Sequence, residues 1–140
     1  MESGFELHPR LAQDTLAFAE LDLCTVRLMN DSRFPWLILV PRRAGAREFH
    51  QLAVAERSVL MEEIAHVSAA LERATGAVKI NVGALGNIVA QLHVHVVARF
   101  ESDAAWPGPV WGSGPACAYD AATRLELVKS LAGAGLQPLA

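Results

Sequence analysis

The chain of 140 residues carries a formal net charge of −3, and 52% of its residues are hydrophobic while 19% are charged. This composition indicates one globular domain over residues 1–140 with a sizeable core, and it excludes a disordered chain. General nucleic-acid binding is not expected, because such proteins are usually basic. No apolar run is long enough to span a membrane, and MESGFELHPR lacks the features of a secretory signal. We therefore expect a cytoplasmic protein.

The first half of the sequence predicts an antiparallel hairpin. Residues 22–30 (DLCTVRLMN) alternate and are rich in β-formers, and residues 35–43 (PWLILVPRR) form an apolar run closed by a proline. Alternation is typical of a half-buried strand, and a continuous apolar run before a breaker is typical of a buried one. The DSRF stretch between them has the composition of a turn. Residues 8–21 give no clear pattern, although they are compatible with a short helix.

The second half of the sequence predicts a long helix, two strands and a closing helix. Residues 53–75 carry an apolar stripe at spacings of three and four, formed by Leu60, Ile64, Val67 and Leu71. Strands are predicted over 77–85 and 88–100, with a turn at Gly86–Asn87 between them. A Pro/Gly-rich loop follows, and residues 121–136 predict the last helix. This order favours an α+β fold with an antiparallel sheet.

Two histidines stand two residues apart in the apolar stretch QLHVHVV. Because side chains alternate faces along a strand, we expect Gln91, His93 and His95 to point to one face of the sheet. The intervening residues Leu92 and Val94 should then face the core. A polar row of this kind on a buried strand is a candidate functional site.

The pattern by itself leaves the chemistry of this row open. Imidazole titrates near neutrality, so acid–base catalysis is one option. Nucleophilic catalysis is another, in which one ring nitrogen donates to a backbone C=O and the other attacks an electrophile. A metal site needs about three or four ligands, and no other histidine has a spacing that supports one: His8, His50 and His66.

Two stretches together resemble the histidine triad (HIT) superfamily. GNIVAQLHVHVVARF is similar to its signature His–φ–His–φ–His–φ–φ, where φ is apolar, and RLMNDSRFPWLILVPRR is similar to its earlier hairpin. The resemblance implies an antiparallel sheet of about five strands with one long helix and a C-terminal helix. It also implies a homodimer that binds purine nucleotides or their conjugates and acts on the α-phosphate, without a cofactor or a metal.

The resemblance implies a role for each matching residue. His93 matches the nucleophile that forms a covalent nucleotidyl-histidine, and His95 matches the histidine that contacts phosphate oxygens. Asn30 matches a ribose-binding residue at a strand end. The other positions that we expect at the nucleotide are Asn81, which approximates a residue near the phosphate or leaving group, the turn residues Gly86 and Asn87, and Arg99.

Three positions depart from the HIT pattern. Gln91 replaces the first histidine of the triad, although its backbone C=O can still orient His93. Ile88 replaces a hydroxyl residue, and Trp36 stands where many members have a fourth histidine. These departures leave a second hypothesis open, a nucleotide-binding regulatory module with little or no turnover. The sequence also leaves open whether a loop tryptophan, Trp106 or Trp111, lines the site.

Overall fold

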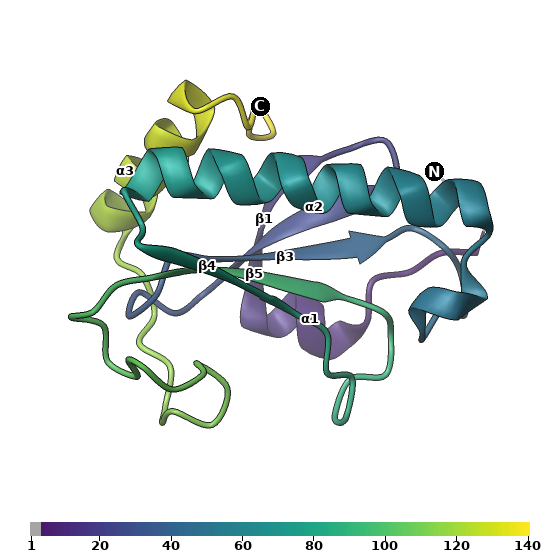
Figure 1. The fold of residues 1–140 in the computed structure, drawn as a ribbon, viewed down its shortest axis with the longest axis horizontal. Helices are drawn as coiled ribbons and strands as arrows, with labels where there is room; N and C mark the ends of the chain where they lie inside the picture. Colours follow the sequence, from purple (N-terminus) through teal and green to yellow (C-terminus); the bar gives the residue numbers. More distant parts are fainter. Residues whose placement is uncertain (1–3) are drawn as a thin grey trace.

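The computed structural model describes residues 4–140 (Figure 1). The first three residues of MESGFELHPR, the stretch considered above for a secretory signal, lie outside the described residues. Five strands and three α-helices follow one another along the chain. Their bounds are α1 Pro9–Asp14, β1 Thr15–Glu20, β2 Cys24–Met29, β3 Trp36–Pro41, α2 Val54–Thr75, β4 Lys79–Gly83, β5 Val94–Arg99 and α3 Ala121–Gly133, with a short 3-10 helix at Phe49–Gln51.

The five strands form one sheet in the order β1-β2-β3-β5-β4, and every neighbouring pair is antiparallel. The hairpin expected from the sequence is β2–β3, in which Leu28 lies opposite Leu37. The prediction of an α+β fold with an antiparallel sheet is confirmed. The segment 8–21 does contain a short helix, α1, but it continues directly into β1, which the sequence analysis did not locate.

Both faces of the central strand β3 are covered, which explains its continuous apolar run. Leu37 and Leu39 belong to a core cluster that includes buried residues of α2 and Leu131 of α3. Trp36 and Ile38 belong to a second cluster on the opposite face, which includes Leu11 of α1. Adjacent residues of a strand face opposite ways, so β3 needs apolar side chains at every position. Figure 1 shows α2 crossing one face, with α1 on the other side of the sheet.

The long helix α2 has clear signals at both ends. Glu56 in its first turn accepts a hydrogen bond from the Ala53 backbone N–H at 3.0 Å, which satisfies one of the free N–H groups at a helix start. Gly76 ends the helix with a φ of 70° and donates its N–H to Glu72 O. Glycine is favoured there because a side chain would be strained at positive φ.

The last strand is shorter than predicted, and this changes where Gln91 lies. The sequence predicted a strand over 88–100, but β5 begins only at Val94. The ladder with β3 starts where Leu39 pairs with Val94, close to Pro41, whose missing N–H cannot extend it. Leu92 instead donates its N–H to Ala46 O at 3.0 Å. Gln91 therefore lies in an irregular segment before the strand.

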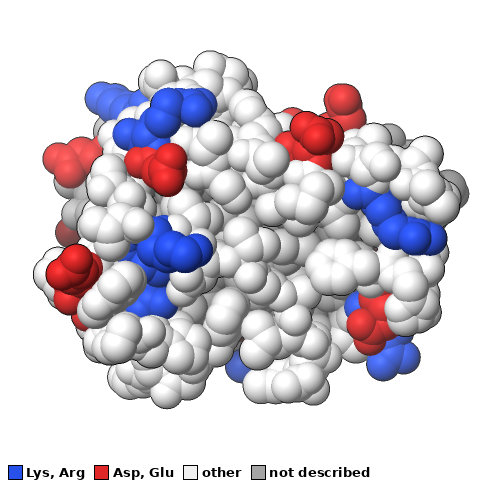
Figure 2. Space-filling model, in the orientation of Figure 1, with Lys and Arg blue, Asp and Glu red and all other residues white. Residues whose placement is uncertain are grey.

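The surface carries charges of both signs. On the face drawn in Figure 2, basic and acidic side chains are interspersed over the left, upper and right parts, while the centre is largely uncharged. Within residues 4–140, no helix is long and apolar enough to cross a membrane.

Candidate active site

A cavity of about 690 Å³ lies against the face of the sheet opposite α2. This histidine cavity, as we call it, has a size typical of small-molecule sites. Four parts of the chain surround it: α1, the turn between β2 and β3, the loop before β5, and the Pro/Gly-rich loop after β5. His93 and His95 both line it, although their residues are only 7% and 6% exposed.

One hydrogen bond fixes the tautomer of His93. Its Nδ1 lies 2.6 Å from the main-chain oxygen of Gln91. Because a carbonyl oxygen can only accept, Nδ1 must carry a proton, and in the neutral ring Nε2 then holds the lone pair. None of residues 4–140 makes a hydrogen bond to that Nε2. In its neutral form His93 thus offers an available nitrogen lone pair, which is what a nucleophile requires.

The opposite tautomer is fixed at His95. The indole Nε1–H of Trp36 donates to His95 Nδ1 at 3.0 Å. An indole nitrogen can only donate, so Nδ1 accepts and the neutral ring carries its proton on Nε2. Burial, together with the nearby His93, lowers the pKa of His95 to about 3. His95 therefore stays neutral near pH 7 and offers an N–H donor.

The two rings are close enough to act on one group. Their centroids are 4.9 Å apart with the planes inclined at 64°. One ring offers a lone pair and its neighbour offers an N–H, both from a buried strand end. A lone pair can attack phosphorus while a donor beside it stabilises negative charge on a phosphoryl oxygen.

Three of the residues expected at a nucleotide also line the histidine cavity: Asn30, Gly86 and Asn87. Asn30 Oδ1 accepts from the Tyr119 N–H at 2.9 Å, so this amide is held in place and its own NH₂ group can donate. Gly86 has a φ of 77°, a conformation that favours glycine. The turn expected at Gly86–Asn87 therefore forms one edge of the cavity.

Comparison with known families finds the HIT domain over residues 10–102. The chain belongs to the HIT family. The matched region contains the histidine pair and the β2–β3 hairpin, so the resemblance seen in the sequence is confirmed. No curated protein matches the chain.

Three solved HIT proteins share both sequence and fold with this chain. A histidine triad protein of Sinorhizobium meliloti 1021 is 48% identical over 94% of this chain and 97% of its own, with a TM-score of 0.91. One of Bradyrhizobium japonicum is 44% identical over 92% and 96%, with a TM-score of 0.90. One of Marinobacter aquaeolei VT8 is 43% identical over 93% and 95%, also with a TM-score of 0.90.

The side chain of Gln91 does not face the histidine cavity of this HIT protein. Its Oε1 accepts from the His8 N–H, and its Nε2 donates to Glu6 O, each at 2.8 Å. The expectation that Gln91, His93 and His95 share one face is therefore wrong for Gln91, because strict alternation begins only with β5 at Val94. The expected orienting contact from its backbone oxygen to His93 is present.

Arg99 and Asn81 also lie away from the cavity, contrary to the sequence-based expectation. Arg99 is 1% exposed, and its guanidinium donates to Asp103, to Asn81 Oδ1 and to Gly108 O at 2.7 to 3.0 Å. The loop after β5 folds over this end of the strand and uses these donors. Arg99 therefore holds the loop, and the Asn81 side-chain oxygen is occupied by Arg99.

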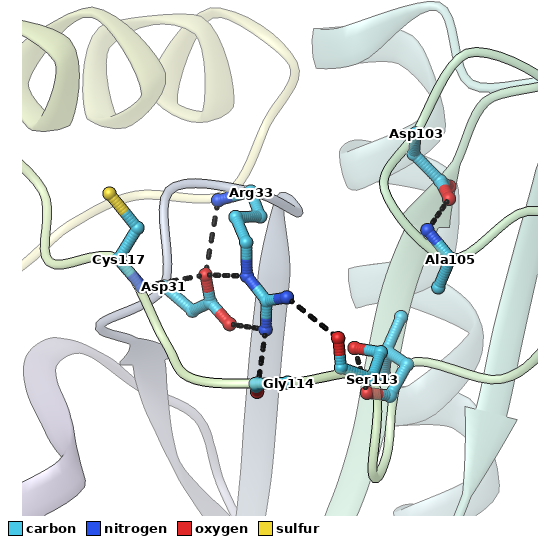
Figure 3. A network of polar contacts seen from close by, with 8 residues as sticks. Asp31, Arg33, Asp103, Ala105, Ser113, Gly114 and Cys117 are labelled. Atoms are coloured by element: carbon cyan, nitrogen blue, oxygen red, sulfur yellow. Dashed lines mark hydrogen bonds and ion pairs between the residues drawn. The ribbon is translucent and has the colours of Figure 1, made fainter.

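A polar network that no sequence pattern indicated shapes one wall of the cavity. Figure 3 shows the Asp31 carboxylate accepting from the Arg33 backbone and guanidinium and from the Cys117 N–H. Arg33 in turn donates to Ser113 O and Gly114 O. Burial raises the pKa of Asp31, but the hydrogen bonds from Arg33 and Cys117 outweigh it and the pKa is lowered. The turn between β2 and β3 is thus hydrogen-bonded to the distant loop at residues 113–117.

Of the two loop tryptophans, Trp111 lines the histidine cavity. Its ring lies edge-on to His95 with centroids 5.3 Å apart. A Cβ at Gly83 would lie only 3.0 Å from Trp111 Cη2. Glycine at this position therefore leaves room for the Trp111 ring to pack against β4. The ring of Trp106 instead lies 5.7 Å from the Arg99 guanidinium. Within the described part of the chain, no three His, Cys, Asp or Glu side chains are placed to hold a metal ion.

Trp36→Phe should release the tautomer of His95. In the unaltered protein we expect ¹⁵N NMR to show His95 protonated at Nε2 and unprotonated at Nδ1. Its ¹⁵N shifts should not change between pH 5 and 8, because a pKa lowered to about 3 keeps the ring neutral in this range. The variant leaves Nδ1 buried without its donor. We expect a mixture of tautomers and a loss of about 1–3 kcal/mol in the free energy of unfolding.

Trp111→Phe is the matched control, since it alters an aromatic ring against His95 but removes no hydrogen bond to it. The His95 spectrum should keep its single tautomer in that variant. A wild-type His95 that titrates between pH 5 and 8 would contradict the assignment.

Proposed function

We propose that this HIT protein is a nucleotide hydrolase or nucleotidyltransferase that acts through a covalent nucleotidyl-histidine. Its substrate would be a nucleoside phosphoramidate, a phosphoester or a dinucleoside polyphosphate. The observation that carries the proposal is the contact between His93 Nδ1 and Gln91 O, which leaves Nε2 as a lone pair in the cavity wall. Membership of the HIT family supports nucleotide binding at this site.

The reaction would proceed in two displacements at the α-phosphorus. His93 Nε2 forms a bond to phosphorus, and the bond to the leaving group breaks with its electron pair going to that group. His95 Nε2–H donates to a phosphoryl oxygen as negative charge develops there. The oxygen of a water or another acceptor then forms a bond to phosphorus and gives up its proton to the leaving group or to solvent, while the bond to His93 Nε2 breaks and its electron pair returns to that nitrogen.

The cavity also offers groups for the rest of a nucleotide. Asn30 can donate its NH₂ to a ribose hydroxyl, since its Oδ1 is already held by Tyr119. Leu11, Met29 and Ile38 give the cavity an apolar wall against which a purine base could lie.

A regulatory module without turnover is the second candidate. Ile88 favours it, because this residue stands where HIT sequences place a hydroxyl, lines the cavity and is 80% exposed. An aliphatic side chain cannot donate to a phosphoryl oxygen. Removing one such donor can cost about 10²–10³ in rate, so the cavity could bind nucleotides and turn them over poorly.

Two measurements separate these candidates. The first is calorimetry with AMP and with GMP, and the second is incubation with adenosine 5′-phosphoramidate labelled with ³²P. Binding together with a labelled protein and released AMP supports the enzyme. Binding without labelled protein or product supports the module. A protein that neither binds nor turns over these nucleotides rejects both the enzyme and the module.

We also propose that two copies associate through the edge strand β4. No strand among residues 4–140 pairs with its outer side. Val82 within this strand is 48% exposed, and Val78 and Leu85, which flank the strand in the sequence, are 58% and 47% exposed. An apolar sheet edge of this kind invites pairing with a second chain. Sedimentation analysis should give twice the chain mass of 15.0 kDa, and Val82→Lys should shift the protein to monomer.

A further inference from the structure

The amide of Gln91 binds the chain 83 to 85 residues away from it. Its oxygen accepts from the His8 N–H and its nitrogen donates to Glu6 O, both at 2.8 Å. An N–H and a C=O two residues apart are the groups that a neighbouring strand would use. The Gln side chain therefore takes the place of a strand and holds the N-terminal segment.

A histidine at this position could not make the same pair of contacts. The oxygen and nitrogen of an amide diverge from one carbon and lie side by side, as an acceptor and a donor. The two nitrogens of an imidazole are separated by a ring carbon, and their hydrogen-bonding directions diverge widely. A glutamine in place of the first triad histidine is therefore suited to binding the N-terminal segment at Glu6 and His8.

The segment that Gln91 holds leads directly into a wall of the histidine cavity. His8 is the N-cap of α1, and its Nδ1 accepts from the Arg10 N–H at 3.0 Å. Helix α1 has six residues, too few to be stable by itself in water. It supplies four residues that line the cavity: Arg10, Leu11, Gln13 and Asp14.

The same residue also orients the nucleophile. The main-chain oxygen of Gln91 accepts from His93 Nδ1 at 2.6 Å. Residue 91 is therefore fixed between the reacting histidine on one side and the start of α1 on the other. Its side chain lies outside the cavity. It can therefore affect a bound ligand only indirectly, through the N-terminal segment and α1 that it holds in place.

We propose that Gln91 is a positioning residue that keeps α1 against the ligand by clamping residues 6–8. This inference rests on the proposed function, because it takes the histidine cavity as the nucleotide site. Gln91→Met removes both amide contacts but keeps the length of the side chain and the backbone oxygen. We expect the Kd for AMP and the KM for adenosine 5′-phosphoramidate to rise about tenfold, with kcat changed less than threefold.

Hydrogen exchange supplies a readout that does not depend on the ligand. The amide of His8 donates to Gln91, so it should exchange faster in Gln91→Met, as should the amides of α1. The matched control is Gln137→Met, since within residues 4–140 the Gln137 side chain makes a single long hydrogen bond, to Ala132 O at 3.4 Å. That variant should leave both affinity and exchange at His8 unchanged.

A double-mutant cycle with Arg10→Ala tests whether Gln91 acts through α1. If it does, the loss in AMP affinity for the double variant should be smaller than the sum of the two single losses. Additive losses would overturn the proposal, as would unchanged exchange at His8 or unchanged affinity in a folded Gln91→Met. Should that variant not fold, Gln91→Glu, which keeps the acceptor and loses the donor, takes its place with the same criteria.

The two proposals fail in different ways. Wild-type protein that binds no AMP rejects the proposed function. Wild-type protein that binds AMP with an affinity that loss of the clamp does not alter rejects only the role of Gln91.

Discussion

His93→Gln should abolish formation of the labelled nucleotidyl intermediate, with a loss of at least about 10³-fold in its rate. An amide side chain is polar and of similar size, but it has no nitrogen lone pair that can attack phosphorus. The fold should persist, since His93 lies before β5 and the sheet does not depend on its ring. The Kd for AMP should stay within about tenfold of the wild type, a difference of about 1.4 kcal/mol.

The matched control for this substitution is His66→Gln. His66 lies on α2, on the other side of the sheet from the histidine cavity, and is exposed. Labelling and product release in that variant should equal those of the wild type. A labelled intermediate in His93→Gln would show that another residue is the nucleophile, and loss of AMP binding as well would show that His93 chiefly holds the ligand.

Asp103→Ala should lower the free energy of unfolding by about 3–5 kcal/mol. The Asp103 carboxylate pairs with Arg99 at 2.8 Å, and the two side chains are only 3% and 1% exposed. It also accepts from the N–H groups of Phe100, Ala105 and Trp106; the bond to Ala105 is drawn in Figure 3. Removing one partner leaves a guanidinium buried without its counter-charge, which is strongly destabilising. Urea unfolding followed by circular dichroism measures the loss.

Asp14→Ala is a control of the same spacing. Arg10 and Asp14 are also four residues apart, but their side chains are 56% and 43% exposed. Water screens such a pair, so the expected loss is below about 1 kcal/mol. Equal losses in the two variants would show that burial of the Arg99–Asp103 pair does not control its contribution.

The buried pair also sets a direction for the response to acid. Hydrogen bonds from the Arg99 side chain, which outweigh the opposing effect of burial, hold the pKa of Asp103 well below its ordinary range. A carboxyl with a lowered folded-state pKa contributes stability above its unfolded pKa and loses it as pH falls further. Wild-type stability should therefore decline below about pH 4, the ordinary range of Asp, and Asp103→Ala should lack this part of the decline.

The sequence alone could predict the elements whose pattern is local. Alternation over residues 22–30 and the apolar run after Pro35 identified the β2–β3 hairpin, and the stripe through Leu60 and Leu71 identified α2. The strand β1 was missed because its sequence, TLAFAE, continues directly from a short helix without a turn signal. Local periodicity reports the backbone conformation of a segment, and it is weakest where one element runs into the next.

Part of the candidate site was also readable from the sequence. The spacing of His93 and His95 singled out both residues, and the structure brings them to one cavity with Asn30 and the Gly86 turn. The HIT pattern was sufficient for the family, because its histidines lie within a few residues of one another.

Only the tertiary structure decided what each polar side chain binds. Trp36 and His95 are 59 residues apart, Gln91 and His8 are 83 apart, and Asp31 and Cys117 are 86 apart. These contacts depend on where the ladder of β5 begins and on how the loop after it folds back. A displacement of one residue would turn each side chain to the other face. The sequence by itself therefore determined that a pair of histidines lies close together in the last strand segment, while its start at Val94 came from the fold. The fold determined that Nδ1 of His93 donates to a main-chain oxygen, that Nδ1 of His95 accepts from Trp36, and that the side chains of Gln91 and Arg99 bind the protein's own loops.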